Sequence, residues 1–322
     1  MDHKAIFQTI AHDFDAVNST ILQQLASNVP MVEKIAQHII SSGGKRMRPT
    51  LVLLSAGLTG GISTAHQELA TVIEFLHTAT LLHDDVVDVS DMRRGRPTAN
   101  TNWGNAPSVL VGDFLYARSF ELLVKIGNLP VMERLASTTR LIAEGEVMQL
   151  MNVKNPDTSE QQYMTVITGK TAILFQASAE TAAILSGCSS AQTRAMAQYG
   201  LNLGLAFQLI DDLLDYSGDS ATLGKNIGDD LAEGKPTLPL IHAMAQGTDA
   251  EIKLIRHAIR KGGLSQMADI LQILQRTKAL AYVEAKAIGH AELAAASLAD
   301  FPASDYHRAL SALTTLAVKR ST

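Results

Sequence analysis

The sequence predicts a nearly all-α protein, because its apolar residues repeatedly fall at helical spacing and its composition favours helices. The spacing is clear in the set Leu135, Leu141, Ile142, Val147 and Leu150. Helix-favouring residues are abundant, and only nine of the 322 residues are proline. Alternating strand patterns are rare, and the β-branched run at 109–111 lies among helix formers. A parallel α/β sheet is therefore disfavoured.

Glycine, proline and serine clusters divide the chain into expected helices of roughly 15 to 30 residues. These clusters lie at 41–44, 94–97, 155–157, 187, 218–219, 234–236 and 262–263. None is long enough for an interdomain linker, and no fixed-period repeat covers the chain. We therefore expect one helical domain over residues 1–322.

Composition excludes several classes of function. The net charge of −5 provides no basic field for nucleic acid or anionic lipid. The single cysteine, Cys188, cannot form an intramolecular disulfide and lacks the companions of a thiolate metal site; we assign it no role. Neither a signal peptide nor an apolar run of about 18 residues is found. A cytoplasmic protein with no transmembrane segment is expected, and a greasy product would bring it only transiently to membranes.

The first chemical signal is Asp84-Asp85-Val86-Val87-Asp88. On a helix, Asp84 and Asp88 lie one turn apart on the same face. Like charges at this spacing destabilise a helix unless a cation or a helix end relieves the repulsion. Taken alone, the motif also fits an ordinary solvated acidic turn.

The same spacing recurs in Asp211-Asp212-Leu213-Leu214-Asp215, again after a strongly apolar stretch. Two such helices facing each other would present carboxylate oxygens suited to hard divalent cations. Mg²⁺ is preferred because it keeps waters and shares its ligands with substrate phosphates. The duplication makes a metal site the better interpretation.

Basic residues are placed to meet a phosphate. Gly43 and Gly44 precede Lys45 and Arg48, so side chains and backbone N–H groups could converge on an anion. The P-loop pattern is absent, and a basic surface turn is the alternative. Arg93 and Arg94 follow the first acidic motif; they suit a diphosphate bridged by magnesium, or else simple pairing with Asp88 or Asp91.

His77 lies two turns before Asp84 on the same expected helix. It could be a hydrogen-bonded core residue, or half of a di-iron Glu-x-x-His pair with Glu74. The di-iron interpretation needs a second Glu-x-x-His, which does not occur. We expect His77 to point toward the same cavity as Asp84, and we interpret His83 as structural.

Taken in order, these motifs resemble the all-trans polyprenyl diphosphate synthases. The resemblance rests on GGKRMRP, HDDVVD with MRRG, GKT at 169–171, FQLIDDLLD and GKNIGDDLAEGKPTLP. It runs in register from about Ser41 to Leu240. Through HTATLLHDDVVD, SVLVGDF and IAEGEVMQLMNV the chain is most similar to the bacterial octaprenyl synthases of that family. The resemblance implies an isoprenoid-synthase helical bundle with a deep central cavity.

The resemblance also implies roles for single residues. The diphosphate of isopentenyl diphosphate would be held by Lys45, Arg48, His77 and Arg94. The allylic diphosphate, from farnesyl diphosphate, would be held by Arg93, Lys170, Thr171, Gln208 and Lys225, with Lys235 a further candidate. Two or three Mg²⁺ ions would be bound directly by Asp84, Asp88 and Asp211, with Asp85, Asp212 and Asp215 as ligands or orienting groups.

The implied reaction begins when magnesium and the basic residues stabilise the charge of the departing allylic diphosphate. Isopentenyl diphosphate attacks the resulting carbocation, and loss of a proton regenerates a longer allylic diphosphate. No side-chain base is obvious, and the resemblance indicates that the departing pyrophosphate accepts the proton. Lys170, Thr171 and Gln208 would orient it.

Product length should depend on the depth of an apolar tunnel. Ala79 and Thr80, about one turn before Asp84, are small where short-chain members of the family carry bulky aromatics. Growth should therefore continue past the farnesyl length. Among Phe120, Leu122, Leu123 and Leu135, the resemblance favours Leu123 and Leu135 as the tunnel floor, although such residues also fit plain core.

Three alternatives stay open. The nearest is the same chemistry with a heptaprenyl, decaprenyl or geranylgeranyl product. A terpene cyclase would share the helical scaffold, but its second metal motif differs from D-D-x-x-D. A non-catalytic synthase subunit could lose an acidic motif, whereas both are present here. A homodimer and a role in quinone side-chain synthesis are implied by the resemblance alone.

Overall fold

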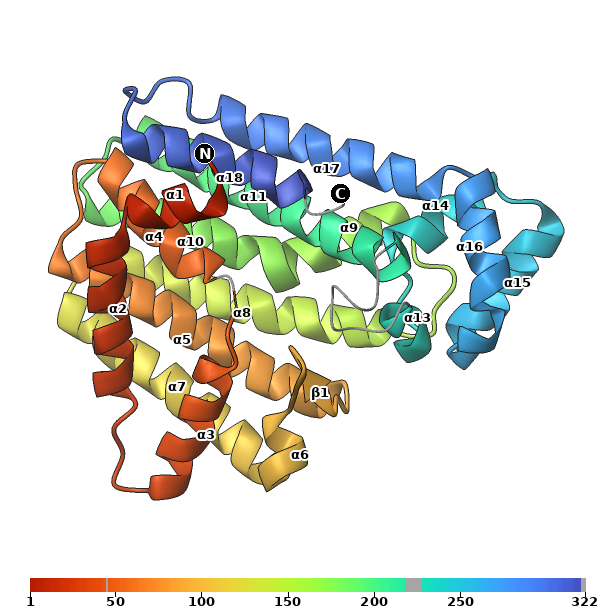
Figure 1. Ribbon diagram of the computed structural model, residues 1–322, viewed down its shortest axis with the longest axis horizontal. Helices are drawn as coiled ribbons and strands as arrows, with labels where there is room; N and C mark the ends of the chain where they lie inside the picture. Colours follow the sequence, from red (N-terminus) through yellow and green to blue (C-terminus); the bar gives the residue numbers. More distant parts are fainter. Residues whose placement is uncertain (45, 218–227, 320–322) are drawn as a thin grey trace. The chain divides into compact units, whose positions relative to one another are not determined.

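The computed structural model describes residues 1–44, 46–217 and 228–319, and these residues confirm the all-α prediction (Figure 1). Among them, none of the helices is both long and apolar enough to cross a bilayer. The helices of the first half are α1 (His3–Gln8), α2 (Ala11–Gln24), α3 (Pro30–Ser41), α4 (Met47–Leu58), α5 (Thr64–Val87), α6 (Ala99–Trp103), α7 (Asn105–Ile126) and α8 (Leu129–Asn152).

The helices of the second half are α9 (Glu160–Ile167), the π-helix η1 (Thr168–Ala172), α10 (Ile173–Leu185), α11 (Ser190–Ser217), α13 (Asp229–Glu233), α14 (Leu238–Gln246), α15 (Asp249–Lys261), the 3₁₀ turn η2 (Leu264–Gln266), α16 (Met267–Arg276), α17 (Ala279–Ala296) and α18 (Asp305–Val318). Several are shorter than the expected 15 residues. In α13 the reason is local, because Gly228 and Gly234 flank it with left-handed backbone at φ 85° and 81°.

The chain divides into two compact units. The first comprises Met1–Thr139, Ala177–Ala197 and Asp300–Ala312. The second comprises Arg140–Gln176, Gln198–Ala299 and Leu313–Thr322. The single domain expected over residues 1–322 stays a prediction, and each unit is described by itself below.

In the first unit, α5 is the central helix and packs against α2, α4 and α7 (Figure 1). It begins with a capping box, in which the Ser63 and His66 side chains satisfy each other's backbone N–H groups. A side chain at Gly112 of α7 would meet the imidazole of His83, so this glycine lets α5 and α7 approach closely. His83 Nε2 also lies 3.2 Å from the Val109 carbonyl of α7.

The expected turn at 94–97 is a small β-hairpin of β1 (Met92–Arg93) and β2 (Arg96–Pro97). Its two turn residues, Arg94 and Gly95, both have positive φ, 52° and 73°. Positive φ at both positions is typical of the tight turns that join antiparallel strands. The hairpin follows α5 directly and therefore carries Arg93 and Arg94 beside the first acidic motif.

In the second unit, glycines bring helix backbones close together. A Cβ at Gly145 of α8 would lie 2.6 Å from the Lys170 nitrogen in η1, and one at Gly204 of α11 would lie 2.7 Å from Cα of Ala172. The π-helix therefore runs in close backbone contact with both neighbours. Such π-turns are rare and frequently occur at functional sites.

Candidate functional site

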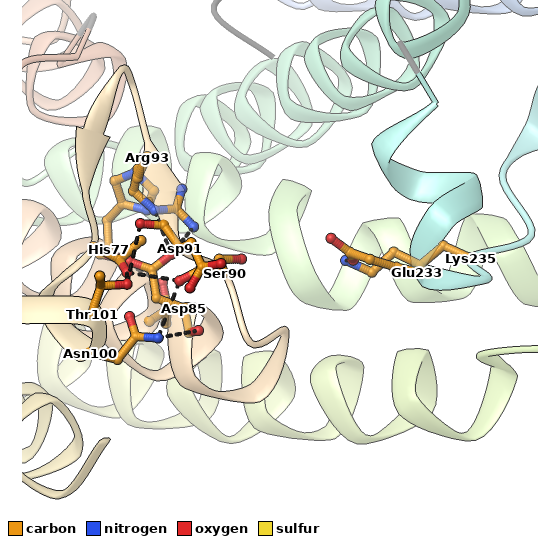
Figure 2. A network of polar contacts seen from close by, with 11 residues as sticks. His77, Asp85, Ser90, Asp91, Arg93, Asn100, Thr101, Glu233 and Lys235 are labelled. Carbon is orange, nitrogen blue, oxygen red and sulfur yellow. Dashed lines mark hydrogen bonds and ion pairs between the residues drawn. The ribbon is translucent and has the colours of Figure 1, made fainter. Parts of the chain in front are cut away.

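The first acidic motif lies at the C-terminal end of α5, where its middle aspartate is fully buried. Asp85 accepts hydrogen bonds from Nε and Nη2 of Arg93, both at 2.8 Å to Oδ1 (Figure 2). Burial raises the pKa of Asp85, although the Arg93 guanidinium opposes that shift. Asp84 and Asp88 are half-buried and lie one turn apart on the same helix.

Backbone contacts fix this end of α5 in place. The Asp85 carbonyl accepts a 2.9 Å hydrogen bond from the Ser90 N–H and a 3.3 Å bond from the Asn100 amide. The same amide donates to the Ser90 carbonyl at 3.1 Å (Figure 2). The loop between α5 and the hairpin is thereby held, and Arg93 is presented to Asp85.

A cluster of arginines surrounds His77 in the first unit. Arg48 Nη1 lies 3.1 Å from His77 Nε2. Burial and the nearby charges of Arg48, Arg94, Arg93 and Arg46 lower the pKa of His77 well below its usual value, so His77 is neutral near pH 7. Burial also lowers the pKa of Arg48 to about 10, still high enough to keep it charged.

Arg94 reaches back to the glycine turn before α4. Its Nη1 donates to the Gly43 carbonyl, and a Cβ at Gly44 would overlap the Arg94 guanidinium. The structure therefore brings Arg48, His77 and Arg94 together, three of the four residues predicted for one diphosphate. The fourth, Lys45, lies outside the described residues.

The second acidic motif lies at the C-terminal end of α11, and its middle aspartate is also buried, with 4% of its surface exposed. Asp212 accepts hydrogen bonds from the Tyr163 hydroxyl (2.5 Å) and from the Gln208 amide (2.7 Å). Burial raises the pKa of Asp212, and the carboxylates of Asp230 and Asp211 raise it further.

The outer aspartates of this motif differ in their surroundings. Asp215 is half-buried and accepts hydrogen bonds from the backbone N–H groups of Asp229 (3.1 Å) and Asp230 (3.3 Å). These N–H groups begin α13, so Asp215 satisfies donors that a helix N-terminus leaves open. Asp211 is exposed.

The π-helix supplies two predicted phosphate-binding residues to the second unit. Lys170 Nζ donates to Glu146 and to Gln149 of α8, both at 2.7 Å. The Thr171 hydroxyl donates to Gln208 Oε1 at 2.9 Å. Since Gln208 in turn donates to Asp212, a hydrogen-bonded chain links Thr171 to the second acidic motif.

A pocket with about 550 Å³ of empty space, part of it open to solvent, lies within the second unit. Its walls include the π-helix, the second acidic motif and the segment after α13, through Gln149, Tyr163, Lys170, Thr171, Gln208, Asp212, Asp230 and Lys235. Lys235 pairs with Glu233 (Figure 2). Lys225 lies outside the described residues.

Several partners of the predicted residues were not identified from the sequence. Tyr163, Glu146 and Gln149 touch predicted residues directly but belong to none of the quoted metal or phosphate motifs. Glu74 was considered only as a di-iron ligand. Its position one turn before His77 was the available signal for a role in the arginine cluster.

The predicted tunnel residues all belong to the first unit. Ala79, Leu123 and Leu135 are buried, with at most 1% of their surface exposed. Thr80 is half-buried, and its hydroxyl donates to the His77 carbonyl at 2.8 Å. Burial suits both a tunnel wall and a plain core, so the tunnel roles stay predictions.

The donor set fits a hard divalent cation. Within the described residues, no three His, Cys, Asp or Glu side chains converge to hold a metal ion by themselves. Magnesium is usually bound by one or two carboxylates together with waters and substrate phosphates. Asp84 and Asp88 can provide such carboxylates. Oδ2 of the intervening Asp85 is buried without a hydrogen-bond partner in the described part of the chain.

Residues 29–276 match the model of the polyprenyl synthetase family. The chain is 48% identical over 321 residues to octaprenyl diphosphate synthase of Escherichia coli (strain K12), covering 99% of both chains. It is 47% identical over 316 residues to the geranyl-diphosphate-specific all-trans-nonaprenyl-diphosphate synthase of Rhodobacter capsulatus, covering 98% and 97%.

Among solved structures, the polyprenyl synthase from Caulobacter crescentus CB15, complexed with calcium and isoprenyl diphosphate, matches with a TM-score of 0.96 and 43% identity. The match covers all of this chain and 98% of that one. The predicted isoprenoid-synthase fold and the predicted class, a long-chain trans-prenyltransferase, are thereby confirmed. The chain belongs to the polyprenyl synthetase family.

Proposed function

We propose that this chain makes all-trans octaprenyl diphosphate by adding isopentenyl units to farnesyl diphosphate. The observation that carries the proposal is the arrangement at the end of α5. There an acidic motif suited to a divalent cation directly precedes a hairpin that carries Arg93 and Arg94 toward Asp85 and the glycine turn. An acidic cation site beside fixed guanidiniums fits a diphosphate bridged by metal.

Isopentenyl diphosphate is assigned to Arg48, His77, Arg94 and Lys45. A planar guanidinium binds phosphate oxygens with two parallel N–H groups, and neutral His77 lies against Arg48 without adding a repelling charge. Because His77 has a lowered pKa, it keeps this neutral form across the physiological range. Isopentenyl diphosphate keeps its diphosphate in the reaction, so this site has only to bind and orient that substrate.

The allylic diphosphate is assigned to Arg93, Lys170, Thr171, Gln208, Lys225 and Lys235. Lys170 and Lys235 both line the pocket of the second unit, where their positive charges offset those of a diphosphate. Glu146 and Gln149 hold the Lys170 ammonium, and Gln208 holds Asp212. Action of both acidic motifs on a single substrate stays a prediction.

Two or three Mg²⁺ ions would be held by Asp84, Asp88 and Asp211, with Asp85, Asp212 and Asp215 orienting that set. When bound, the ions supply Lewis-acid stabilisation of the charge on the leaving diphosphate. Arg93 and Lys170 stabilise the same charge by hydrogen bonds to its oxygens. Buried apolar side chains around both motifs exclude water from the allylic cation.

The proton lost after condensation goes to the departing pyrophosphate, which Lys170 and Thr171 keep in place. The reaction then needs neither a covalent nucleophile nor a side-chain base. In each addition, one allylic C–O bond breaks, one C–C bond forms, and one proton leaves carbon. The new allylic diphosphate then serves as substrate for the next addition.

A product longer than farnesyl is favoured by the small side chain of Ala79, and an octaprenyl product by the 48% identity to an octaprenyl synthase. Leu123 and Leu135 are proposed as the floor. A nonaprenyl product is the second candidate, because a relative of almost equal identity makes it. We further propose a cytoplasmic homodimer that supplies quinone side chains.

The test is the requirement for both substrates. Purified protein with Mg²⁺ should release pyrophosphate only when farnesyl and isopentenyl diphosphate are both present, and chelation of Mg²⁺ should abolish release. Asp84→Ala should lower kcat by about 10²-fold or more, on the scale of losing one charge-stabilising group. Asp91→Asn, an exposed aspartate three residues beyond the motif, is the matched control and should stay near wild type.

Two outcomes would contradict this function. Release of pyrophosphate from farnesyl diphosphate alone would indicate a terpene cyclase. Absence of release under all conditions would indicate a subunit that only modulates a synthase.

A further inference from the structure

Glu74 is a buried acid inside the arginine cluster, and nothing in the proposed reaction uses it. It lies on α5 one turn before His77, with 7% of its surface exposed. Its Oε1 forms a 3.3 Å ion pair with Nη1 of Arg46. Burial raises the pKa of Glu74, while the charges of Arg46, Arg48 and Arg94 act in the opposite direction and favour the carboxylate.

Arg46, the partner of Glu74, has an unusual backbone. It precedes α4 as its N-cap with φ 45° and ψ 37°, in the left-handed region. This backbone conformation is unfavourable for a residue with a Cβ, so tertiary contacts must hold Arg46 in it. The Arg46 side chain supplies two of them, because Nη2 donates to the Ile40 carbonyl in α3 at 3.2 Å while Nη1 faces Glu74.

The start of α4 also sets the position of Arg48. Arg48 is the second residue of that helix and reaches His77 on α5. A shift of the Arg46 turn would therefore move the Arg48 guanidinium away from His77. Glu74 and His77 lie one turn apart on α5, so one helix face anchors both arginines.

We propose that Glu74 is a positioning residue for isopentenyl diphosphate: it holds Arg46 in its left-handed turn and thereby places Arg48 in the diphosphate subsite. This inference rests on the proposed function, which assigns Arg48 to that substrate. Glu74 exerts two opposing effects on a bound diphosphate. Its negative charge repels the ligand, whereas its contact with Arg46 orders the cluster, and the proposal states that ordering dominates.

Glu74→Gln separates these effects, because it keeps the shape of the side chain and removes the charge. We expect the KM for isopentenyl diphosphate to rise at least about tenfold, as for loss of one buried ion-pairing partner. The KM for farnesyl diphosphate should not change, and kcat should stay within about threefold. A fall in the KM for isopentenyl diphosphate would overturn the proposal, since charge repulsion would then dominate.

Glu68→Gln is the matched control. Glu68 lies on the same helix and pairs with Lys125 of α7, away from the arginine cluster. Its substitution should leave both KM values unchanged. If it raised the KM for isopentenyl diphosphate as much as Glu74→Gln does, a general effect on α5 would replace the specific role of Glu74.

A double-mutant cycle tests whether Glu74 acts through Arg46. Arg46→Gln should reproduce the effect of Glu74→Gln, and the double variant should be no worse than either single one. Additive effects would contradict the proposed route. If Glu74→Gln does not fold, Arg46→Lys serves instead, because lysine keeps the positive charge but lacks the planar guanidinium. It should give the same selective rise in the KM for isopentenyl diphosphate. An unchanged KM would reject the proposal.

Binding of isopentenyl diphosphate in the absence of Mg²⁺, measured by calorimetry, separates this inference from the proposed function. Weaker binding to Glu74→Gln than to wild type supports the positioning role even if wild type transfers no prenyl group. Equal or tighter binding rejects the role even if the enzyme is fully active.

Discussion

At the scale of single residues, the two acidic motifs share a feature that their spacing does not reveal. The middle aspartate of each is buried and held by a protein donor: Asp85 by Arg93, and Asp212 by Tyr163 and Gln208. These contacts fit an orienting role for Asp85 and Asp212, while direct metal binding by Asp84, Asp88 and Asp211 stays a prediction. The resemblance to the family already implies this division of roles. What the sequence alone does not reveal is the hold by Tyr163, which lies 49 residues from Asp212 along the chain.

Tyr163→Phe tests the hold on Asp212. The change removes one hydroxyl from a buried 2.5 Å hydrogen bond to a carboxylate, so the free energy of unfolding should fall by about 1.5–3 kcal/mol. Tyr282→Phe is the matched control, because that hydroxyl bonds the half-buried Glu160 nearer the surface; its cost should be at most about 1 kcal/mol. Equal costs in denaturant titrations would argue against a structural hold on Asp212.

At the scale of elements, helical periodicity predicted an all-α chain. The glycine, proline and serine clusters marked the ends of α3, α8, α11 and α15, but neither end of α7 or α17. Periodicity did not predict the π-helix at 168–172, since a π-turn depends on neighbouring helices rather than on propensity. Gly145 is the decisive neighbour, because its missing side chain lets α8 approach Gly169 and the backbone of Lys170. In the sequence, the only signal of this close approach was Gly145 itself, a glycine inside an expected helix.

Gly145→Ala should therefore destabilise the protein and disturb Lys170. The added Cβ would lie 2.6 Å from the Lys170 nitrogen, a backbone atom that cannot swing aside. We expect a loss of about 1–3 kcal/mol in the free energy of unfolding, together with a lower kcat.

Gly289→Ala gives the opposite expectation. It too is a glycine inside a helix, α17, but a Cβ there meets nothing within 4 Å. Alanine should stabilise the protein by up to about 1 kcal/mol through its helix propensity, with no change in kcat. Thermal unfolding of the two variants side by side checks both, and destabilisation by Gly289→Ala equal to that by Gly145→Ala would contradict the steric account.

At the scale of the whole molecule, the order of motifs along the chain was enough to predict the family and the long-chain class, and the relatives confirm both. Product length is harder to predict from sequence, because the side chains proposed to set it look like ordinary core. Ala79, Leu123 and Leu135 are all buried, as either role requires. The depth of a cavity depends on how side chains pack in three dimensions, so no short sequence motif reports it.

Chain-length analysis of the product shows whether this protein is an octaprenyl diphosphate synthase. Purified protein is incubated with Mg²⁺, farnesyl diphosphate and an excess of isopentenyl diphosphate, and the dephosphorylated products are separated by reversed-phase chromatography against prenyl alcohol standards. We expect one dominant product of eight isoprene units. A predominantly four-unit, geranylgeranyl product would contradict this expectation, because growth would then stop despite the small Ala79 and Thr80.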